Sequence, residues 1–317
     1  MVLFIKRLRC ILPDLTTTIG KETFQNPIFV ASGTFGYGLE NNDLVDVSKL
    51  GAIITKSITR HPREGNPPPR IVETPSGMIN SIGLANIGVE QYIEEMIPKY
   101  EGIGVPIIMN IAGSSEEEYC EILEMMETIS SNIVGYEINI SCPNVKVGGI
   151  EFGVDPGVTE TLTSALRNRT EKLLIMKLSP NVTDIRQIAR AAENGGADAV
   201  SAINTVYGMS INAQSRKTNI HTIYGGLSGP AIKPIGLACV HKISTAVKIP
   251  IIGIGGITNA EDAIEYMLAG ASSVQIGTAN FRNPAAGISI IKAIESYCHK
   301  ANISHISDLI GKVAINE

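Results

Sequence analysis

Eight short apolar runs constrain the fold of this chain more than any other feature. Each run ends in polar or glycine residues, and most are followed by a helical pattern; they span residues 27–31, 52–55, 106–109, 134–140, 173–178, 199–203, 250–254 and 273–276. Continuous apolar runs are typical of strands buried on both faces, and helices between them are typical of crossovers between parallel strands. Eight such units predict a (β/α)8 TIM barrel, although periodicity alone leaves an open doubly wound sheet as the alternative.

Composition favours one domain over residues 1–317, because the chain is 44% hydrophobic with no compositional break. A net charge of -5 and the absence of a basic run argue against nucleic acid or an anionic membrane surface as partner. The first dozen residues are too short and too charged to span a bilayer, and we interpret them as a first strand or hairpin. The five scattered cysteines contain no C-x-x-C pair, which predicts reduced thiols in a cytoplasm and no metal site.

Helix caps and long loops refine this prediction. Ser114 and Ser115 precede a run of glutamates, and Thr258 and Asn259 precede another acidic turn before a helix over 263–269 that Gly270 ends. Three connections exceed the minimal length, namely 58–88, 142–156 and 205–229. Extended loops on the carboxyl-terminal face of a barrel usually form a lid or a wall over its site.

The segment 137–145 predicts a catalytic rim. Isoleucines alternate there with Asn139 and Ser141, and Pro143 stops the strand directly after Cys142. Two amides and a hydroxyl within six residues are poor core material, yet they suit the edge of a planar polar ligand. The alternative is that Cys142 is a small buried hydrophobic residue, as most free cysteines are.

Other strand ends carry cations and glycines. Lys56 and Lys177 each follow an apolar run, where an unpaired ammonium is costly, so they need an anionic partner, most simply a bound ligand. Gly255 with Gly256, and Gly277 with Thr278, resemble the phosphate cup of many barrels, with tight strand-to-helix turns as the alternative. Neither segment is G-x-G-x-x-G, which argues against a Rossmann-type site.

Together these motifs resemble the class 1 dihydroorotate dehydrogenases, the soluble flavin enzymes of pyrimidine synthesis, nearly from end to end. The segments that carry the resemblance are 31–36, 55–57, 80–84, 139–144, 177–180, 203–205, 225–230, 255–256 and 277–278. The family is an FMN-containing (β/α)8 barrel that oxidises (S)-dihydroorotate to orotate, which agrees with the fold predicted from the residues.

The resemblance implies a role for each rim residue. Cys142 would be the general base, and Lys56 would also be catalytic. Orotate would contact Lys56, Asn80, Ser81, Ile82, Gly83, Leu84, Asn139, Asn144, Asn204 and Thr205. FMN would contact Ser32, Lys56, Ser57, Asn110, Asn139, Lys177, Ile203, Gly229, Gly255, Gly256, Gly277 and Thr278, with Lys177 stabilising negative charge near N1 and C2 of the reduced flavin.

Segments 63–70 and 144–153 look like the 1B subtype. That subtype passes electrons to NAD through a partner subunit with FAD and a [2Fe-2S] cluster, and a homodimer of the catalytic chain forms the core of a heterotetramer. The alternatives are the fumarate-using 1A subtype, a non-flavin phosphate-binding barrel enzyme, and a catalytically silent scaffold subunit. Residues 212–223 match no motif of the family.

Overall fold

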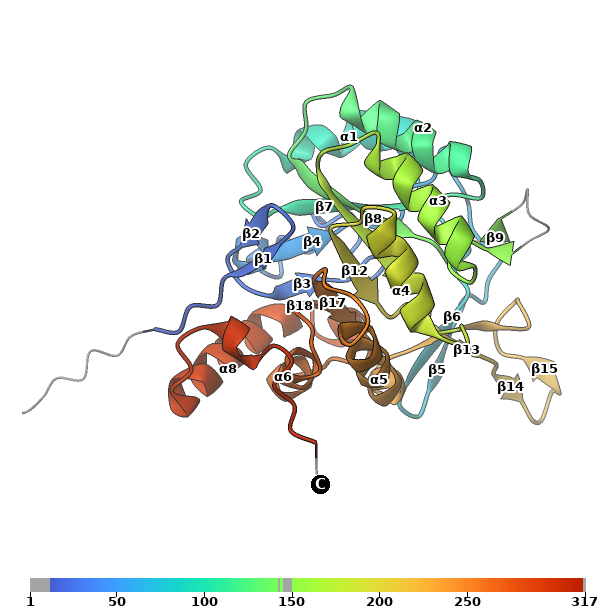
Figure 1. Ribbon diagram of the computed structural model, residues 1–317. Coiled ribbons are helices and arrows are strands. Elements are labelled where there is room, and N and C mark those ends of the chain that lie inside the picture. The colour runs from blue at the N-terminus through green and yellow to red at the C-terminus, as the bar shows by residue number, and fades with distance from the viewer. Residues whose placement is uncertain (1–11, 142, 145–149, 316–317) are drawn as a thin grey trace, which may run out of the picture.

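The barrel predicted from the eight apolar runs is the architecture of the protein. The structure is a computed structural model that describes residues 12–141, 143–144 and 150–315 (Figure 1). Eight parallel strands close the barrel in chain order: β3 (Ile28–Val30), β4 (Ala52–Ile54), β7 (Ile107–Ala112), β8 (Ile133–Asn139), β11 (Leu173–Leu178), β12 (Ala199–Ala202), β17 (Ile251–Ile254) and β18 (Ser273–Ile276). Pairing of β18 with β3 completes the closure, so the open sheet is excluded.

Every strand overlaps its predicted run, and one is longer than predicted. β7 continues past residue 109 through Asn110 to Ala112. The polar residue does not end the strand, because the Asn110 side chain points inward and donates a hydrogen bond to Glu137 on the neighbouring strand. Period-2 alternation thus continues with a polar residue at an inward position.

The amino-terminal half of the barrel interior is apolar. Phe29, Ile54, Ile108 and Ile175 belong to a cluster of fully buried side chains from the barrel strands. A hairpin of β1 (Thr17–Ile19) and β2 (Glu22–Phe24) adds Ile19 and Phe24 to the same cluster. The first strand or hairpin predicted in the first dozen residues lies almost entirely outside the described residues, and the β1–β2 hairpin begins at Thr17.

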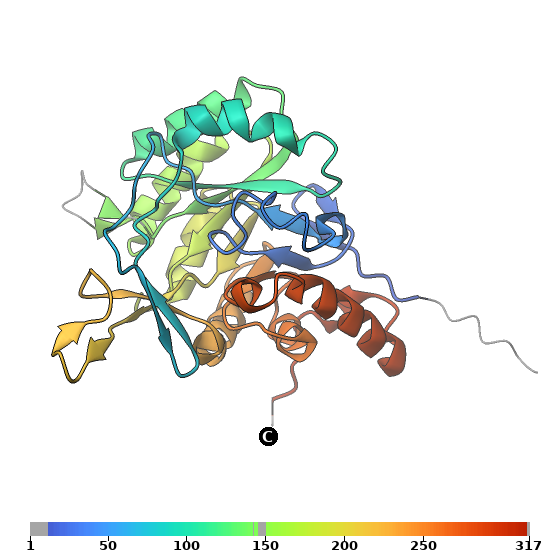
Figure 2. The same cartoon turned by 180° about the vertical axis from the view of Figure 1, so that it is seen from behind.

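Helices surround the barrel on its outer side (Figures 1 and 2). They are α1 (Gly88–Glu95), α2 (Glu116–Glu127), α3 (Pro156–Arg167), α4 (Ile185–Asn194), α5 (Lys233–Ser244), α6 (Ala260–Leu268), α7 (Ala279–Arg282) and α8 (Ala286–Ala301), with short 3-10 turns η1 (Val47–Lys49), η2 (Ile97–Tyr100), η3 (Pro230–Ile232) and η4 (Ile306–Leu309). None of the helices in the described ranges is long and apolar enough to cross a membrane.

Two predicted caps are confirmed. The Ser115 side chain accepts from the Glu118 amide at 3.3 Å, and Asn259 accepts from the Asp262 amide at 3.0 Å in a full capping box. α6 therefore begins at Ala260, three residues before the predicted 263, because its acidic first turn is already helical. Gly270, with φ +119°, follows the last turn as predicted.

The long loops build a second layer on the carboxyl-terminal face. β5 (Ile71–Thr74), β6 (Gly77–Asn80), β13 (Val206–Gly208) and β16 (Gly225–Ser228) form an antiparallel sheet in the order β13-β16-β6-β5. Two small ribbons accompany it, β9 (Pro143–Asn144) with β10 (Ile150–Glu151), and β14 (Ile211–Asn212) with β15 (Lys217–Thr218). The strands lie together on the right-hand side of Figure 1, so the loops predicted as a lid or a wall contain short paired strands joined by irregular segments.

Candidate active site

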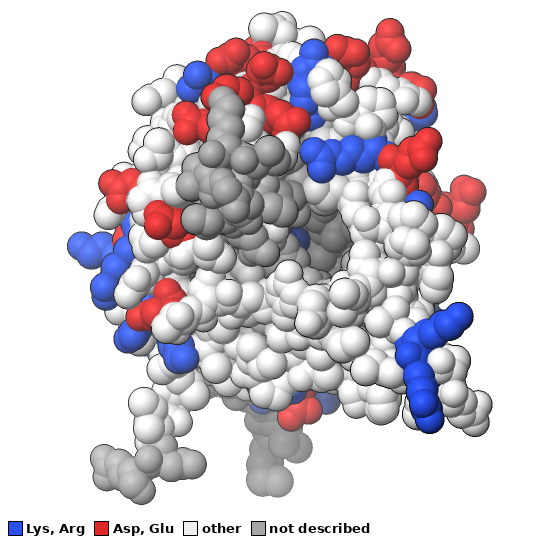
Figure 3. Space-filling model, turned by 90° about the vertical axis from the view of Figure 1, so that its right-hand side faces the viewer, with Lys and Arg blue, Asp and Glu red and all other residues white. Residues whose placement is uncertain are grey.

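The predicted rim residues converge at the carboxyl ends of the barrel strands. Lys56 follows β4, Asn139 ends β8, Lys177 lies near the end of β11 and Asn204 follows β12. Viewed onto this face, the molecule is hollowed near its centre, and a basic side chain is visible inside the hollow (Figure 3). Barrel enzymes bind their ligands at this end of the strands.

Lys56 is a half-buried cation with another cation nearby. Burial lowers the pKa of its ammonium, the Arg70 guanidinium lowers it further, and Glu40 opposes the shift. Its backbone amide donates to the Gly36 carbonyl at 2.9 Å, which ties the rim of β4 to the loop after β3. Two cations that raise each other's electrostatic energy are suited to an anionic ligand group such as a carboxylate.

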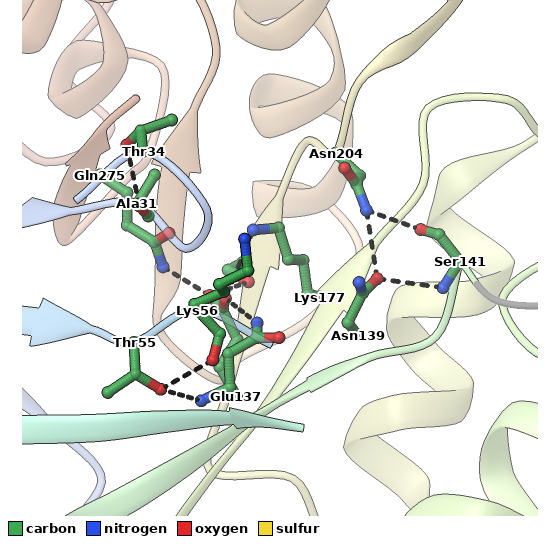
Figure 4. A network of polar contacts seen from close by, with 12 residues as sticks. Ala31, Thr34, Thr55, Lys56, Glu137, Asn139, Ser141, Lys177, Asn204 and Gln275 are labelled. Atoms are coloured by element: carbon green, nitrogen blue, oxygen red, sulfur yellow. Dashed lines mark hydrogen bonds and ion pairs between the residues drawn. The ribbon is translucent and has the colours of Figure 1, made fainter. Parts of the chain in front are cut away.

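Lys177 has a partner within the chain, which corrects the prediction that its anion would most simply be a ligand. Its Nζ lies 3.4 Å from Oε1 of Glu137, and the two side chains are 8% and 0% exposed. Asn110 Nδ2 donates to the same oxygen at 2.7 Å. Ser201 Oγ and Gln275 Nε2 donate to Oε2 at 2.8 and 2.5 Å (Figure 4).

This carboxylate was missed because Glu137 stands in the middle of an apolar strand. Asn110, Glu137, Ser201 and Gln275 come from four strands and are all fully buried. Each has an inward position by the period-2 alternation of its strand. The signal that could have found them is a polar residue at the same depth in several predicted strands, since barrel side chains stack in layers.

The amides predicted for the ring of the substrate form a compact group. Asn204 Nδ2 donates to Asn139 Oδ1 at 3.2 Å and to Ser141 Oγ at 2.9 Å, and the Ser141 amide donates to Asn139 Oδ1 at 3.3 Å (Figure 4). The Thr205 amide in turn donates to Asn204 Oδ1 at 2.8 Å. These contacts fix the orientation of both amides at the rim before any ligand binds.

The segment from Asn80 to Leu84 forms the edge of the second layer. Asn80 Nδ2 donates to the Gly226 carbonyl across β6 and β16 at 3.3 Å. The Ser81 amide donates to the Arg70 carbonyl at 2.7 Å, and the Ile82 carbonyl accepts from the Asn66 amide at 3.0 Å. Gly83 and Leu84 both have positive φ, +75° and +56°, so the chain turns sharply here.

Thr205 lies close to β16. A Cβ at Gly226 would be only 2.1 Å from Thr205 Oγ1, so this approach requires glycine. β13, which begins directly after Thr205, and β6, which ends at Asn80, pair with opposite edges of β16.

The predicted phosphate cup is built from close backbone approaches. Gly229 and Gly256 have φ of +95° and +70°, and a Cβ at Gly256 would be 2.9 Å from the Gly229 carbonyl oxygen. Tyr266 donates to the Gly255 carbonyl at 2.7 Å from α6. Gly277 and Thr278 lie beside this turn, between β18 and α7. A phosphate cup and a tight strand-to-helix turn both require such close approaches, and we call the turn at Gly229, Gly255 and Gly256 the backbone cradle.

Three of the remaining predicted cofactor residues lie on the same rim, and Asn110 lies deeper, within β7 beside Glu137. Ser32 and Ser57 are half-buried after β3 and β4, and Ile203 is buried after β12. Asn110 Oδ1 and Gln275 Oε1 are buried and have no hydrogen-bond partner among the described residues. A planar ligand with N–H donors would meet that need, because buried acceptors are normally satisfied.

Two predicted residues have little or no structural description. Cys142 lies outside the described residues, and Asn144 lies in β9, where its backbone pairs with Ile150. Within the described ranges, no three His, Cys, Asp or Glu side chains come together as a metal-binding group.

Comparisons with known proteins agree over nearly the whole chain. Residues 14–298 match the family described as dihydroorotate dehydrogenase. A Geotalea daltonii protein called "Dihydroorotate dehydrogenase B (NAD(+)), catalytic subunit" is 50% identical over 303 residues, 96% of this chain and 99% of the relative. A Bacteroides thetaiotaomicron protein of the same name is 47% identical over 302 residues, 95% of this chain and 99% of the relative.

Among solved structures, the Eimeria tenella DHODH in complex with ferulenol matches with a TM-score of 0.75. The match covers 98% of this chain and 91% of that chain, at 22% sequence identity. At this identity the likeness concerns the fold alone.

Proposed function

The chain belongs to the dihydroorotate dehydrogenase family, and we propose that it is the catalytic subunit of a class 1B enzyme that oxidises (S)-dihydroorotate to orotate with NAD as the final acceptor. The observation that carries this proposal is 46–50% identity over nearly the full length of relatives that share one name. The rim adds the residue types that the reaction needs. The alternative phosphate-binding barrel has no use for the amide group around Asn139.

Oxidation removes a proton from C5 and a hydride from C6 of the ring, so a base is needed on one face and a hydride acceptor on the other. We assign the base to Cys142, which directly follows Ser141 in the chain. Asn139 and Asn204 hold Ser141 in place, and they would orient the ring through its carbonyl and N–H groups. Lys56 and Arg70 would attract the carboxylate.

The residues at the carboxyl ends of the strands fit FMN. The cradle of Gly229, Gly255 and Gly256 offers backbone to a phosphate, and Asn110 and Gln275 offer buried acceptors without a partner. When bound, FMN supplies the hydride acceptor at N5. Lys177 would stabilise negative charge that develops on the pyrimidine edge of the flavin.

The route of electrons to NAD requires a second protein, because this chain has no dinucleotide fingerprint and no cluster-forming cysteine pattern. The relatives are called catalytic subunits, which supports a partner. We propose that the partner carries FAD and a [2Fe-2S] cluster and that two copies of this chain form the core of a heterotetramer.

The test begins with the isolated chain. It should purify with one FMN, and anaerobic dihydroorotate should bleach the flavin and yield orotate. The chain alone should pass electrons to artificial dyes but not to NAD. Efficient NAD reduction without a partner would remove the need for a second subunit, and efficient fumarate reduction would move the assignment to class 1A. A chain that neither contains nor takes up FMN would refute the flavin chemistry.

A further inference from the structure

The buried carboxylate of Glu137 is not needed for the proton or hydride transfer of the proposed reaction. We propose that Glu137 is a positioning residue that fixes the Lys177 ammonium at the barrel mouth and offsets its charge, and thereby sets the reduction potential of the bound flavin. The inference rests on the proposed function, since it concerns the FMN held by this chain. A buried charge destabilises the fold unless it is paired, and this role would explain why Glu137 is retained there.

Glu137 is held by donors from four other strands. Lys177 on β11 is 3.4 Å from Oε1, and Asn110 on β7 donates to that oxygen at 2.7 Å. Ser201 on β12 and Gln275 on β18 donate to Oε2 at 2.8 and 2.5 Å. Both oxygens thus accept from donors only, as an ionised carboxylate does. The carboxylate cannot shift without breaking several bonds, so its charge has a fixed position.

The network lies between the apolar interior and the rim. Ile175, two residues before Lys177 on the same strand, belongs to the apolar cluster of the interior. The next inward-facing residue of β11 toward the rim is Lys177, which is the register partner of Asn139 on β8. Glu137 is two residues before Asn139 on β8, so it lies one level below the rim. A flavin at the rim would contact the ammonium first and sense the carboxylate behind it.

The two charges have opposite effects on a reduced flavin, which gains negative charge near N1. The ammonium of Lys177 favours the reduced form, and the carboxylate of Glu137 opposes it. Together they form a neutral pair whose dipole points its positive end at the rim. Loss of Glu137 alone would leave the cation unopposed and raise the potential.

A purely structural role makes a different prediction. If Glu137 served only to satisfy its four neighbours, a neutral isostere would lower stability and cofactor affinity without a directed shift of the potential. The two roles therefore separate in a measurement on the flavin itself. Stability alone does not distinguish them.

The experiment compares FMN-loaded Glu137→Gln with the parent protein by sulfite titration, because the sulfite adduct at N5 places negative charge near N1. We expect sulfite affinity to rise roughly 10- to 100-fold, the effect of one unit charge at about 6–10 Å with an effective dielectric constant of about 20. At about 30 mV per tenfold for a two-electron couple, this equals an upward shift of roughly 30–60 mV. Unchanged or weaker sulfite binding would overturn the inference.

Two further variants serve as controls. Ser201→Ala removes one donor but keeps both charges, so its sulfite affinity should stay within a few-fold of the parent. The double variant Glu137→Gln with Lys177→Met removes the unopposed ammonium and should cancel the rise. A rise that persists in the double variant would contradict the charge-pair explanation.

Thermal unfolding covers the case in which Glu137→Gln folds poorly. The double variant leaves no unpaired buried charge and should recover at least half of the lost melting temperature. A double variant less stable than the single one would refute the pairing. None of these measurements uses dihydroorotate. If Glu137→Gln binds FMN but its sulfite affinity is unchanged, this inference is overturned and the proposed function is unaffected.

Discussion

Replacement of Gly256 by alanine tests the backbone cradle that we assign to the FMN phosphate. Gly256 has φ +70°, and a Cβ there would be 2.8 Å from the Lys233 amide nitrogen and 2.9 Å from the Gly229 carbonyl oxygen. A left-handed backbone costs alanine about 1–2 kcal/mol, and overpacking against rigid backbone adds about 1–3 kcal/mol. We therefore expect Gly256→Ala to lower the free energy of unfolding by about 2–5 kcal/mol and to weaken FMN binding.

Gly102→Ala is the matched control. Gly102 has a similar φ of +75°, but a Cβ there would have no heavy atom within 4 Å. It should lose only the conformational part, about 1–2 kcal/mol, and keep full FMN affinity. Urea unfolding of the apo-proteins measures the free energies, and fluorescence titration measures FMN binding. If the two variants unfolded with equal free energies and bound FMN equally well, the close approach at Gly256 would have no consequence.

Three further predictions concern a cap, a cation and the base. Burial raises the pKa of Asp262, but hydrogen bonds from Lys233 and Thr258 outweigh this effect and leave the pKa below 3.8. Asp262→Asn should therefore lower the free energy of unfolding in urea by about 1.5–3 kcal/mol at neutral pH. This loss of free energy should shrink only as the pH falls below about 3.8, where the carboxylate of the parent protein becomes protonated. Because the pKa of Lys56 is lowered by burial, orotate affinity in spectral titrations should fall as the pH rises toward 10.5, and a Lys56→Met variant that keeps the same pH profile would exclude the ammonium. Cys142→Ala should retain FMN yet lose roughly 10²–10⁴-fold in turnover, so near-normal turnover would remove Cys142 from the mechanism.

The barrel could be predicted because buried parallel strands leave a local signal. All eight runs overlap an observed strand, and β11 and β18 match their runs at both ends. The caps at Ser115 and Asn259 were equally visible, since capping depends on residues three apart.

The second layer and the charge network could not be predicted in the same way. The strands of the second layer contain glycines such as Gly225 and Gly226, which have low strand propensity and pair only because partners from distant segments approach closely. Glu137 was missed since its partners lie 27 to 138 residues away along the chain. Resemblance to a family identifies the residues that contact ligands, but it does not readily identify the buried residues that support them.

The most direct test of the proposed chemistry is anaerobic titration of the purified, FMN-loaded chain with (S)-dihydroorotate, followed by absorbance. We expect stoichiometric bleaching of the flavin with release of orotate, and no reduction of NAD until an electron-transfer subunit is added. A bound flavin that dihydroorotate fails to reduce, with the protein folded and able to bind orotate, would contradict the assignment.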